Sequence, residues 1–346
     1  MTRSRDVADT QDNSGGAVAP YVAGKNGVIN GGFDVWQRGT SIVPTTTAYT
    51  ADRWNGYRSG TGSTISRQVT GDTTNLPFIQ YCARAQRDSG NASTAKIYIG
   101  TTLESTNSIC FAGKSVTLSF YARAGANFSA ASSTLLLSFA TGTNTDLNYV
   151  TGSSAGWTTT TQAYTLTTTW QRFTYTTTIP STAVQIASML DYSPVGTAGA
   201  ADYFDVTGVQ LEIGSVATPF SRNGGTISGE LAACQRYYFR ATASAVYSSL
   251  TLTGQGNTTS IADCMFPVPV TMRTYPTSVD YANVALSDEV AGVYSGGTLL
   301  ISGSVYSNQY IPIRYTHTSA ALTTYRVYKI IANNNSSAYV GVSAEL

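Results

Sequence analysis

The sequence predicts an all-β protein, in which a β-sandwich is followed by a second, smaller C-terminal β domain and a short helix joins them. Three observations lead to this class. Only 11% of the 346 residues are charged, compared with about 25% in a typical soluble domain. Thr and the 23 Tyr residues, which suit half-buried pleated surfaces, replace the helix-forming Glu, Lys and Leu. Apolar residues also recur with a period of two in short segments separated by turn residues, which is typical of a sandwich.

Charge and apolar content exclude two classes of partner. The net charge is +1 and no block of basic residues occurs, so the footprint of a nucleic-acid-binding protein is absent. No apolar stretch approaches the roughly 20 residues that insertion across a membrane needs. The four cysteines, Cys82, Cys110, Cys234 and Cys264, form no Cys-x-x-Cys motif. We expect them to be buried, reduced thiols.

Residues 1–24 form a polar segment with alternating charges and without the apolar core of a secretory signal. One interpretation is a frayed terminus. The other is an arm that becomes ordered only when it docks on a larger assembly. In the second case Arg3, Arg5 and Asp6 are the candidate docking residues.

The region 25–222 is predicted to be the first domain. Three of its segments alternate between apolar and polar residues, which gives each strand one buried face. These segments are SVTLSFYARAG, STLLLSFATG and WQRFTYTTTIP. In YFDVTGVQLEIG the alternation changes phase at Thr207–Gly208, which predicts a β-bulge.

The opening segment GKNGVINGGFDVWQRGTS is predicted to contain the first strand of this domain. The glycine pair Gly31–Gly32 would let the backbone bend, and the large apolar side chains would be buried. The residues expected in the sheet or the core are Val28, Ile29, Phe33, Trp36 and, further on, Trp54.

Residues 223–238 are predicted to form the connecting helix and the domain boundary. Thr226 or Ser228 can cap its start, and Glu230 lies in the first turn, where a carboxylate is favoured. Residues 239–346 then form the second domain, with strands in AVYSSLTLTG, MFPVPVTMR, GTLLISGSVYS, YRVYKIIAN and AYVGVSAEL. The Pro-Val-Pro sequence confines its segment to a sheet edge or a bend.

Several motifs, in this order along one chain, resemble those of tailed-phage virion proteins. INGGFDVWQRGT, YTADRWNGYR and FDVTGVQLEIGSVATPFSR resemble the ends of one jelly-roll domain of the carbohydrate-binding-module kind. GELAACQRYYFR, FPVPVTMRTYPT and the final VSAEL are similar to the C-terminal part of tail-fibre or structural proteins, and RSRDVADTQ resembles their N-terminal arm. The resemblance implies a jelly-roll fold for residues 25–222.

The same resemblance implies partners and a location. It implies that residues 1–24 dock on other virion proteins and that the chain forms a homotrimer. It also implies synthesis in the host cytoplasm and a place on the virion surface, as a tail fibre or another external fibre. A weakly charged surface rich in Tyr and Thr can be buried between like subunits without desolvating ions. Jelly-roll modules of this kind often hold a structural calcium ion, for which the oxygen ligands Asp205 and Glu212 are the candidates.

The sequence shows no catalytic constellation. His317 is the only histidine, so a Ser-His-Asp device would depend on it alone and a zinc site with several histidines is excluded. Glycoside hydrolysis needs two carboxylates a few ångströms apart, and no pattern marks an acid and a nucleophile. The carboxylates considered are Asp191, Asp202, Asp205, Glu212, Asp263, Asp288 and Glu289. We therefore expect a protein that is not an enzyme and that needs no cofactor.

Loops rich in aromatic and amide side chains favour binding instead. They are RWNGYRSGTG, TGTNTDLNYVTGSSAGW and SVYSNQYIP. An aromatic plane complements the CH face of a sugar ring, and neutral amides and hydroxyls complement its hydroxyl rim. The candidate glycan-binding residues are Tyr57, Tyr149, Trp157, Tyr306 and Tyr310.

The function that these observations favour is non-enzymatic attachment of a virion fibre to host-surface glycans, with several weak sites acting together. Two alternatives stay open at this point. One is a purely structural head-decoration or baseplate component without a ligand, and the other is a polysaccharide depolymerase.

Overall fold

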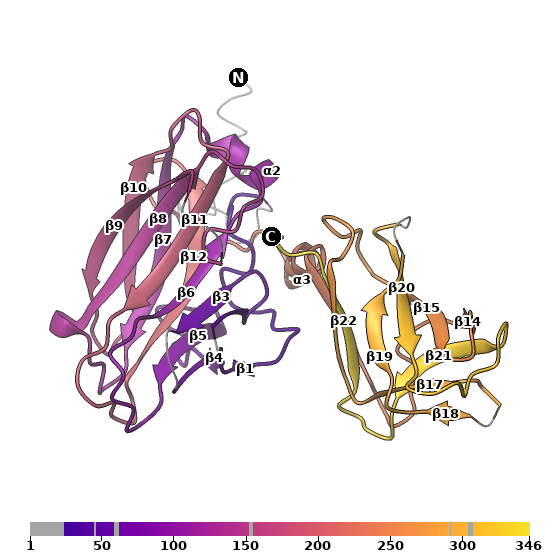
Figure 1. The fold of residues 1–346 in the computed structure, drawn as a ribbon. Coiled ribbons are helices and arrows are strands. Elements are labelled where there is room, and N and C mark those ends of the chain that lie inside the picture. Colours follow the sequence, from indigo (N-terminus) through magenta and orange to yellow (C-terminus); the bar gives the residue numbers. More distant parts are fainter. Residues whose placement is uncertain (1–23, 45, 59–61, 152–154, 291, 304–306) are drawn as a thin grey trace. The chain divides into compact units, whose positions relative to one another are not determined.

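The computed structural model describes residues 24–44, 46–58, 62–151, 155–290, 292–303 and 307–346. The chain forms two compact units, residues 1–233 with Leu346 and residues 234–345. Strands are the main regular secondary structure of both units, and the helices are few and short (Figure 1), so the predicted all-β class is confirmed. Within the described residues, no helix has the length and apolar character that crossing a bilayer requires.

Two six-stranded antiparallel sheets build the first unit. The first sheet contains, from edge to edge, β1 (Ser41–Ile42), β4 (Ser63–Val69), β5 (Tyr81–Arg87), β12 (Tyr203–Ile213), β7 (Ser115–Ala124) and β10 (Gln171–Thr178). The second sheet contains β2 (Thr47–Tyr49), β3 (Asn55–Arg58), β6 (Ile97–Thr102), β11 (Gln185–Tyr192), β8 (Thr134–Gly142) and β9 (Trp157–Thr165).

The order of the eight strands from β5 to β12 makes this sandwich a jelly roll. In the first sheet β5 pairs with β12, β12 with β7, and β7 with β10. In the second sheet β6 pairs with β11, β11 with β8, and β8 with β9. Apart from β8 and β9, which pair within one sheet, successive strands thus cross between the sheets in the pattern of two Greek keys. The topology of the chain itself confirms the predicted jelly roll.

The predicted alternation fills the core between the sheets. In β7 the side chains of Val116, Leu118 and Phe120 are at most 1% exposed and belong to one apolar cluster with those of β8 and β12. The predicted bulge in β12 is also confirmed, because the register with β7 shifts between Thr207 and Gln210. Gly208 has φ +59° there, a left-handed conformation that glycine adopts without strain.

The prediction of a first strand in the opening segment is wrong. Residues 24–40 follow turns and coil, although Val28 and Phe33 are almost completely buried. The Nδ2 of Asn26 donates to the carbonyl of Val209, and its Oδ1 accepts from the N–H of Leu211. Backbone bonds from Gly27 N–H to Leu211 and from Val209 N–H to Gly31 join them. Side-chain bonds and isolated backbone bonds together hold this segment against β12 without strand geometry.

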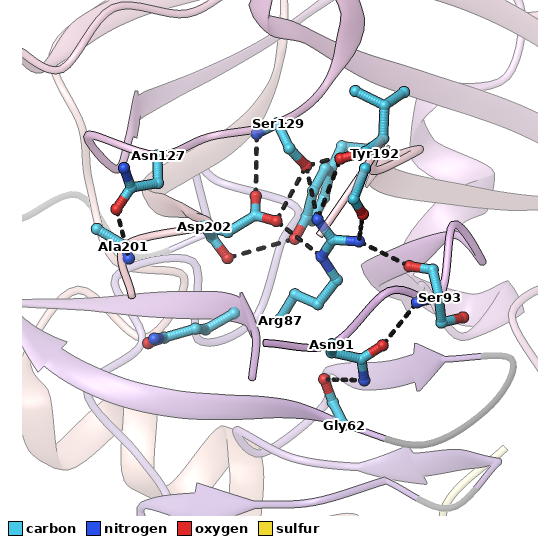
Figure 2. Close-up of polar contacts among 12 residues, drawn as sticks. Gly62, Arg87, Asn91, Ser93, Asn127, Ser129, Tyr192, Ala201 and Asp202 are labelled. Carbon is cyan, nitrogen blue, oxygen red and sulfur yellow. Dashed lines mark hydrogen bonds and ion pairs between the residues drawn. The ribbon is translucent and has the colours of Figure 1, made fainter. Parts of the chain in front are cut away.

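One end of the sandwich is closed by a buried ion pair between Arg87 and Asp202 (Figure 2). The Nε of Arg87 donates to Asp202 Oδ2 at 2.8 Å, and both residues are at most 1% exposed. Ser129 donates to the same carboxylate through its N–H and its hydroxyl. The pair thereby ties β5 to the connections that precede β8 and β12.

Short helices occur between the strands. They are α2 (Ser105–Ser108), the 3-10 turns η2 (Ile109–Phe111) and η3 (Ala131–Ser133), and α3 (Ile227–Gln235). α3 confirms the predicted short helix, and Thr226 caps it, because its hydroxyl accepts from the N–H of Gly229 at 3.1 Å. The buried Glu230 accepts from the N–H groups of Asn30 and Gly224. Burial raises the pKa of Glu230, although these two bonds act in the opposite direction.

Two antiparallel sheets build the second unit. The smaller one contains β13 (Tyr238–Thr242), β22 (Tyr339–Ser343) and β16 (Ser278–Ala282). The larger one contains β18 (Val293–Tyr294), β17 (Val284–Ser287), β21 (Val327–Ala332), β14 (Gly254–Gly256), β15 (Ile261–Pro267), β20 (Tyr310–Thr316) and β19 (Thr298–Ile301).

Two sequence predictions need correction outside the first sandwich's core. The segment 245–253 is mostly turn rather than strand, with a single bridge from Ser249 to Ile331. Cys110 is exposed and not buried, while the other three cysteines are buried, and none of the four is in a disulfide. Pro267 ends β15, which agrees with the bend expected at Pro-Val-Pro.

Candidate binding face

The second sheet of the first unit has one apolar face in the core and one face turned away from it, which we call the outer face. The core face carries Ile97, Ile99 and Leu190, all nearly fully buried. The residues between them point the other way, because side chains alternate along a strand. One row across the outer face consists of Thr47, Tyr57, Tyr98, Asp191 and Leu136, which are cross-strand partners in succession.

Tyr57 and Tyr98 form a stacked pair on this face. Their ring centroids are 4.6 Å apart and their planes differ by 17°. Both side chains are half-buried, and the Tyr98 hydroxyl donates to the carbonyl of Val150 at 3.3 Å. Tyr57 was predicted in a loop, but it lies on β3, and the strand pairing fixes it beside Tyr98.

Tyr149 and Trp157 form a second ring pair on the outer face. Their centroids are 5.1 Å apart with an interplanar angle of 56°. Trp157 begins β9 opposite Gly142, where a Cβ atom would come within 2.9 Å of the indole, so glycine leaves room for the ring. The Tyr149 hydroxyl shares a hydrogen bond of 2.9 Å with Thr159, which fixes its position.

Residues 148–150 connect the two ring pairs. Asn148 is 5% exposed, and its Nδ2 donates to the hydroxyl of Tyr49 at 3.0 Å. Its Oδ1 accepts from the Val150 N–H, and the Tyr149 N–H donates to the Thr102 hydroxyl on β6. Tyr98 and Thr102 are about 13 Å apart along that strand. The outer face therefore has two aromatic surfaces, and hydrogen bonds fix residues 148–150 between them.

Three buried polar atoms of this face find no hydrogen-bond partner among the described residues. They are Asn55 Oδ1, Trp157 Nε1 and Asp191 Oδ2. Asn55 lies opposite Gly100, in the row next to that of Tyr57. Leaving such a group unpaired costs about 1–3 kcal/mol, so each of these atoms calls for an explanation, and a bound polar ligand would supply one.

The structure brings together three of the five predicted glycan-binding residues, namely Tyr57, Tyr149 and Trp157. Tyr310 is 54% exposed at the start of β20 in the second unit and belongs to another surface. Tyr306 and the predicted docking residues Arg3, Arg5 and Asp6 lie outside the described residues.

Sequence reasoning missed Tyr98, Asn55 and Lys96. The missed signal for Tyr98 is its place in KIYIGTT, where it is the large polar residue between two core isoleucines. An aromatic ring at that parity must point away from the core. Asn55 and Lys96 carried no comparable signal, because only the pairing of distant strands places them on this face.

Every carboxylate that the sequence flagged has a basic partner. The pairs are Asp191–Lys96, Asp202–Arg87, Asp205–Arg84 and Arg123, Glu212–Lys25, Asp263–Arg314, Asp288–Arg326 and Glu289–Lys329. The two carboxylates considered for calcium are thus held by arginine or lysine, and Glu212 also accepts from Thr218. Among the described residues no group of three or more His, Cys, Asp or Glu side chains could hold a metal ion.

Another hollow of the first unit lies beside the loop between β4 and β5. It has a volume of about 550 Å³, and its lining combines apolar side chains, including Leu76, Phe78 and Phe220, with polar ones. Among the polar ones, Arg222 pairs with Asp34 at 2.7 Å. Because no orphaned polar atom lies in this lining, the outer face of the second sheet is the better candidate site.

Several solved structures are similar to part of this chain. The enzymatically active domain of tailspike protein 4 from bacteriophage CBA120 aligns over 55% of this chain and 21% of that chain, with 14% identity and a TM-score of 0.36. TmCBM61, solved in complex with β-1,4-galactotriose, aligns over 55% and 99%, with 9% identity and a TM-score of 0.34. A xylan-binding domain from Paenibacillus barcinonensis aligns over 56% and 98%, with 9% identity and a TM-score of 0.30.

This chain therefore spans about a fifth of the tailspike chain and nearly all of the two binding modules. No protein-family model matches the sequence, and no curated protein does. At these identities and scores, the fold assignment stands on the strand order of the chain itself, which is that of a jelly-roll β-sandwich.

Proposed function

We propose that this chain is a non-enzymatic virion fibre protein of a tailed phage that attaches to host-surface glycans through the outer face of the second sheet. The observation that carries the binding proposal is the arrangement on that face. Four aromatic rings in two pairs lie together with three buried polar atoms that lack a partner among the described residues. Sugar rings offer both apolar faces for the rings and hydroxyls for the polar atoms.

The assignment to a phage fibre rests on the motif resemblance of the sequence. In this assignment residues 1–24 dock on other virion proteins. The choice of a binding role over hydrolysis rests on the sequence, in which no pattern marks an acid and a nucleophile.

Replacing both Tyr57 and Tyr98 by alanine is expected to weaken glycan binding about 30-fold or more. Aromatic anchors at the centre of an interface contribute at least about 2 kcal/mol when removed. The measurement is binding of the purified protein to an array of bacterial surface polysaccharides. Isothermal titration with a short oligosaccharide of the best ligand then gives the affinity.

Tyr325→Ala is the matched control, because Tyr325 is 81% exposed and lies in the second unit. It should bind glycan like the unchanged protein. Loss of binding in this control, with retention in the double variant, would place the receptor site on the second unit and refute the proposal. Release of new reducing ends from the same polysaccharides would refute the non-enzymatic part.

We also propose that like subunits associate through the edge formed by β9, in keeping with the homotrimer that the resemblance implies. β9 pairs only with β8, so its other backbone edge is free of strand partners in the described structure. It is nine residues long and mostly exposed. Proteins usually protect a long edge strand with charged side chains or proline, and β9 contains neither. In a closed ring of three, this edge would pack on a different surface of the next copy.

Placing lysine at Thr158 and Gln162 is expected to convert the assembly to monomers. The two lysines on each edge would lose their hydration on association. This desolvation costs more free energy than the hydroxyl contacts across the edge contribute. Sedimentation equilibrium gives the mass. The control carries the same added charge at the exposed positions Thr73 and Thr106 and should keep the mass of the unchanged protein.

A further inference from the structure

A hollow of about 300 Å³ lies on the outer face beside the row of Tyr57 and Tyr98. Leu136 gives its lining an apolar patch, and Lys96, Thr134, Asp191 and Ser193 give it polar groups. The hollow is thus chemically mixed in the way that a sugar unit requires, with apolar contacts, which also include Ala130 and Ala131, and several hydrogen-bonding groups.

Asp191 is the unusual member of this lining. The residue is 1% exposed, its Oδ1 lies 3.1 Å from Lys96 Nζ, and its Oδ2 is buried without a partner among the described residues. Burial raises the pKa of its carboxyl, although the nearby ammonium lowers it. An unpaired buried oxygen of this kind lowers the stability of the folded protein. A ligand that donates a hydrogen bond to it would offset that cost on binding.

The strand register connects this carboxylate to the aromatic surface. Asp191 on β11 is the direct cross-strand partner of Tyr98 on β6, and Tyr98 stacks on Tyr57. Directly opposite residues have Cβ atoms about 5 Å apart. A chain of sugars lying on the two rings would therefore place its next unit at the hollow.

We propose that the hollow is a sugar subsite in which Asp191 Oδ2 accepts a hydrogen bond from a hydroxyl of a neutral hexose unit. The proposal rests on the glycan-binding function of this face and names the class of its ligand. Lys96 already balances the charge of Asp191. A cationic amino sugar would compete with that ammonium, and an acidic sugar would bring a second negative charge to the same carboxylate.

Asp191→Asn tests the subsite, because asparagine keeps the shape of the side chain. It replaces the unpaired carboxylate oxygen by an amide group, either the uncharged oxygen or the NH₂, which donates hydrogen bonds. The probes are neutral, amino-sugar and uronate-containing bacterial polysaccharides on one array, followed by titration of a short oligosaccharide from the strongest ligand. The expected result is preference for a neutral glycan and an affinity about 10- to 100-fold lower in the variant. Glu289→Gln removes the carboxylate of another lysine pair, outside this face, and should leave the affinity unchanged.

The outcomes separate the two proposals. If Tyr57→Ala with Tyr98→Ala abolishes binding but Asp191→Asn binds like the unchanged protein, the subsite is refuted and the glycan-binding face stands. Preference for a uronate-containing or amino-sugar polysaccharide refutes the neutral class. If the unchanged protein binds no polysaccharide of any class, both proposals fail. Unaltered tryptophan fluorescence of the Asp191→Asn variant during thermal unfolding shows that the comparison concerns folded protein.

Discussion

Replacing Asp202 by alanine is expected to lower the free energy of unfolding of the first unit by about 3–5 kcal/mol, the usual cost of removing one partner of a buried ion pair. The guanidinium of Arg87 would stay buried without its counter-ion. Its remaining acceptors are neutral: the carbonyls of Ser93, Val195 and Gly196 and the hydroxyl of Ser129. These bonds orient the guanidinium (Figure 2) but do not neutralise it.

Tryptophan fluorescence in urea measures this effect on the first unit alone. All four tryptophans lie in that unit: Trp36, Trp54, Trp157 and Trp170. Asp88→Ala is the control, since Asp88 is an exposed carboxylate just after β5, and it should change the free energy by less than about 0.5 kcal/mol. A loss below about 1 kcal/mol for Asp202→Ala would show that the pair does not close this end of the sandwich.

Replacing both members of the pair should cost less than replacing one. Arg87→Met combined with Asp202→Leu leaves no buried charge, and apolar pairs of similar volume often match a buried ion pair in stability. A double variant as unstable as Asp202→Ala would instead assign the loss to the disrupted bonds of the surrounding loops. The comparison therefore tells the effect of the charge from the effect of the loop contacts.

The sheets could be predicted from the sequence wherever a strand has one face in the core. In SVTLSFYARAG every second residue is apolar, and those residues of β7 pack in the core between the sheets, although Thr117 and Ser119 on the other face are buried too. The bulge at Thr207–Gly208 was visible for the same reason, because it reverses the phase of that alternation. Local pattern suffices when burial follows the pleat.

The opening segment shows where local pattern fails. Its apolar residues are buried as expected, yet the backbone makes turns, because asparagine side chains and isolated backbone bonds to β12 supply the hydrogen bonds that a strand would take from a neighbour. Asn26 bonds to residues more than 180 positions away, and no local signal shows such a partner. Burial was therefore predictable here and conformation was not.

The binding face was predictable only in part for a related reason. Tyr57, Tyr149 and Trp157 were recognisable as aromatic residues among amides and hydroxyls. Their neighbours depend on which strands pair, and Asp191 reaches Tyr98 only through the pairing of β11 with β6. The sequence thus identified the chemistry of the face, whereas the register decided which residues share it.

Asn30 is the residue whose replacement should most directly release the opening segment. Its Nδ2 donates to the carbonyls of Val35 and Asp52, and its Oδ1 accepts from the Val35 N–H. Its backbone N–H also donates to Glu230, and its carbonyl accepts from the indole of Trp54. Asn30 thereby joins the opening turn to the residues just before β3 and to α3.

Asn30→Ala is expected to lower the free energy of unfolding of the first unit by about 3–5 kcal/mol. Three side-chain hydrogen bonds contribute about 1 kcal/mol each. The φ angle of +58° lies in the left-handed region, which asparagine tolerates and which costs alanine about 1–2 kcal/mol. Urea unfolding followed by tryptophan fluorescence gives the difference, and Asn75→Ala, in an exposed loop, should leave the free energy nearly unchanged.

Asn30→Gly separates the two causes, because glycine adopts positive φ without strain but has no side chain. Its loss should be smaller than that of Asn30→Ala, by about the 1–2 kcal/mol of backbone strain, and should stay well above that of the Asn75 control. If glycine at this position were as stable as asparagine, the side-chain bonds would not be what holds the segment. The buried turn would then owe its shape to the packing of Phe33 against Trp54, whose ring centroids lie 4.7 Å apart.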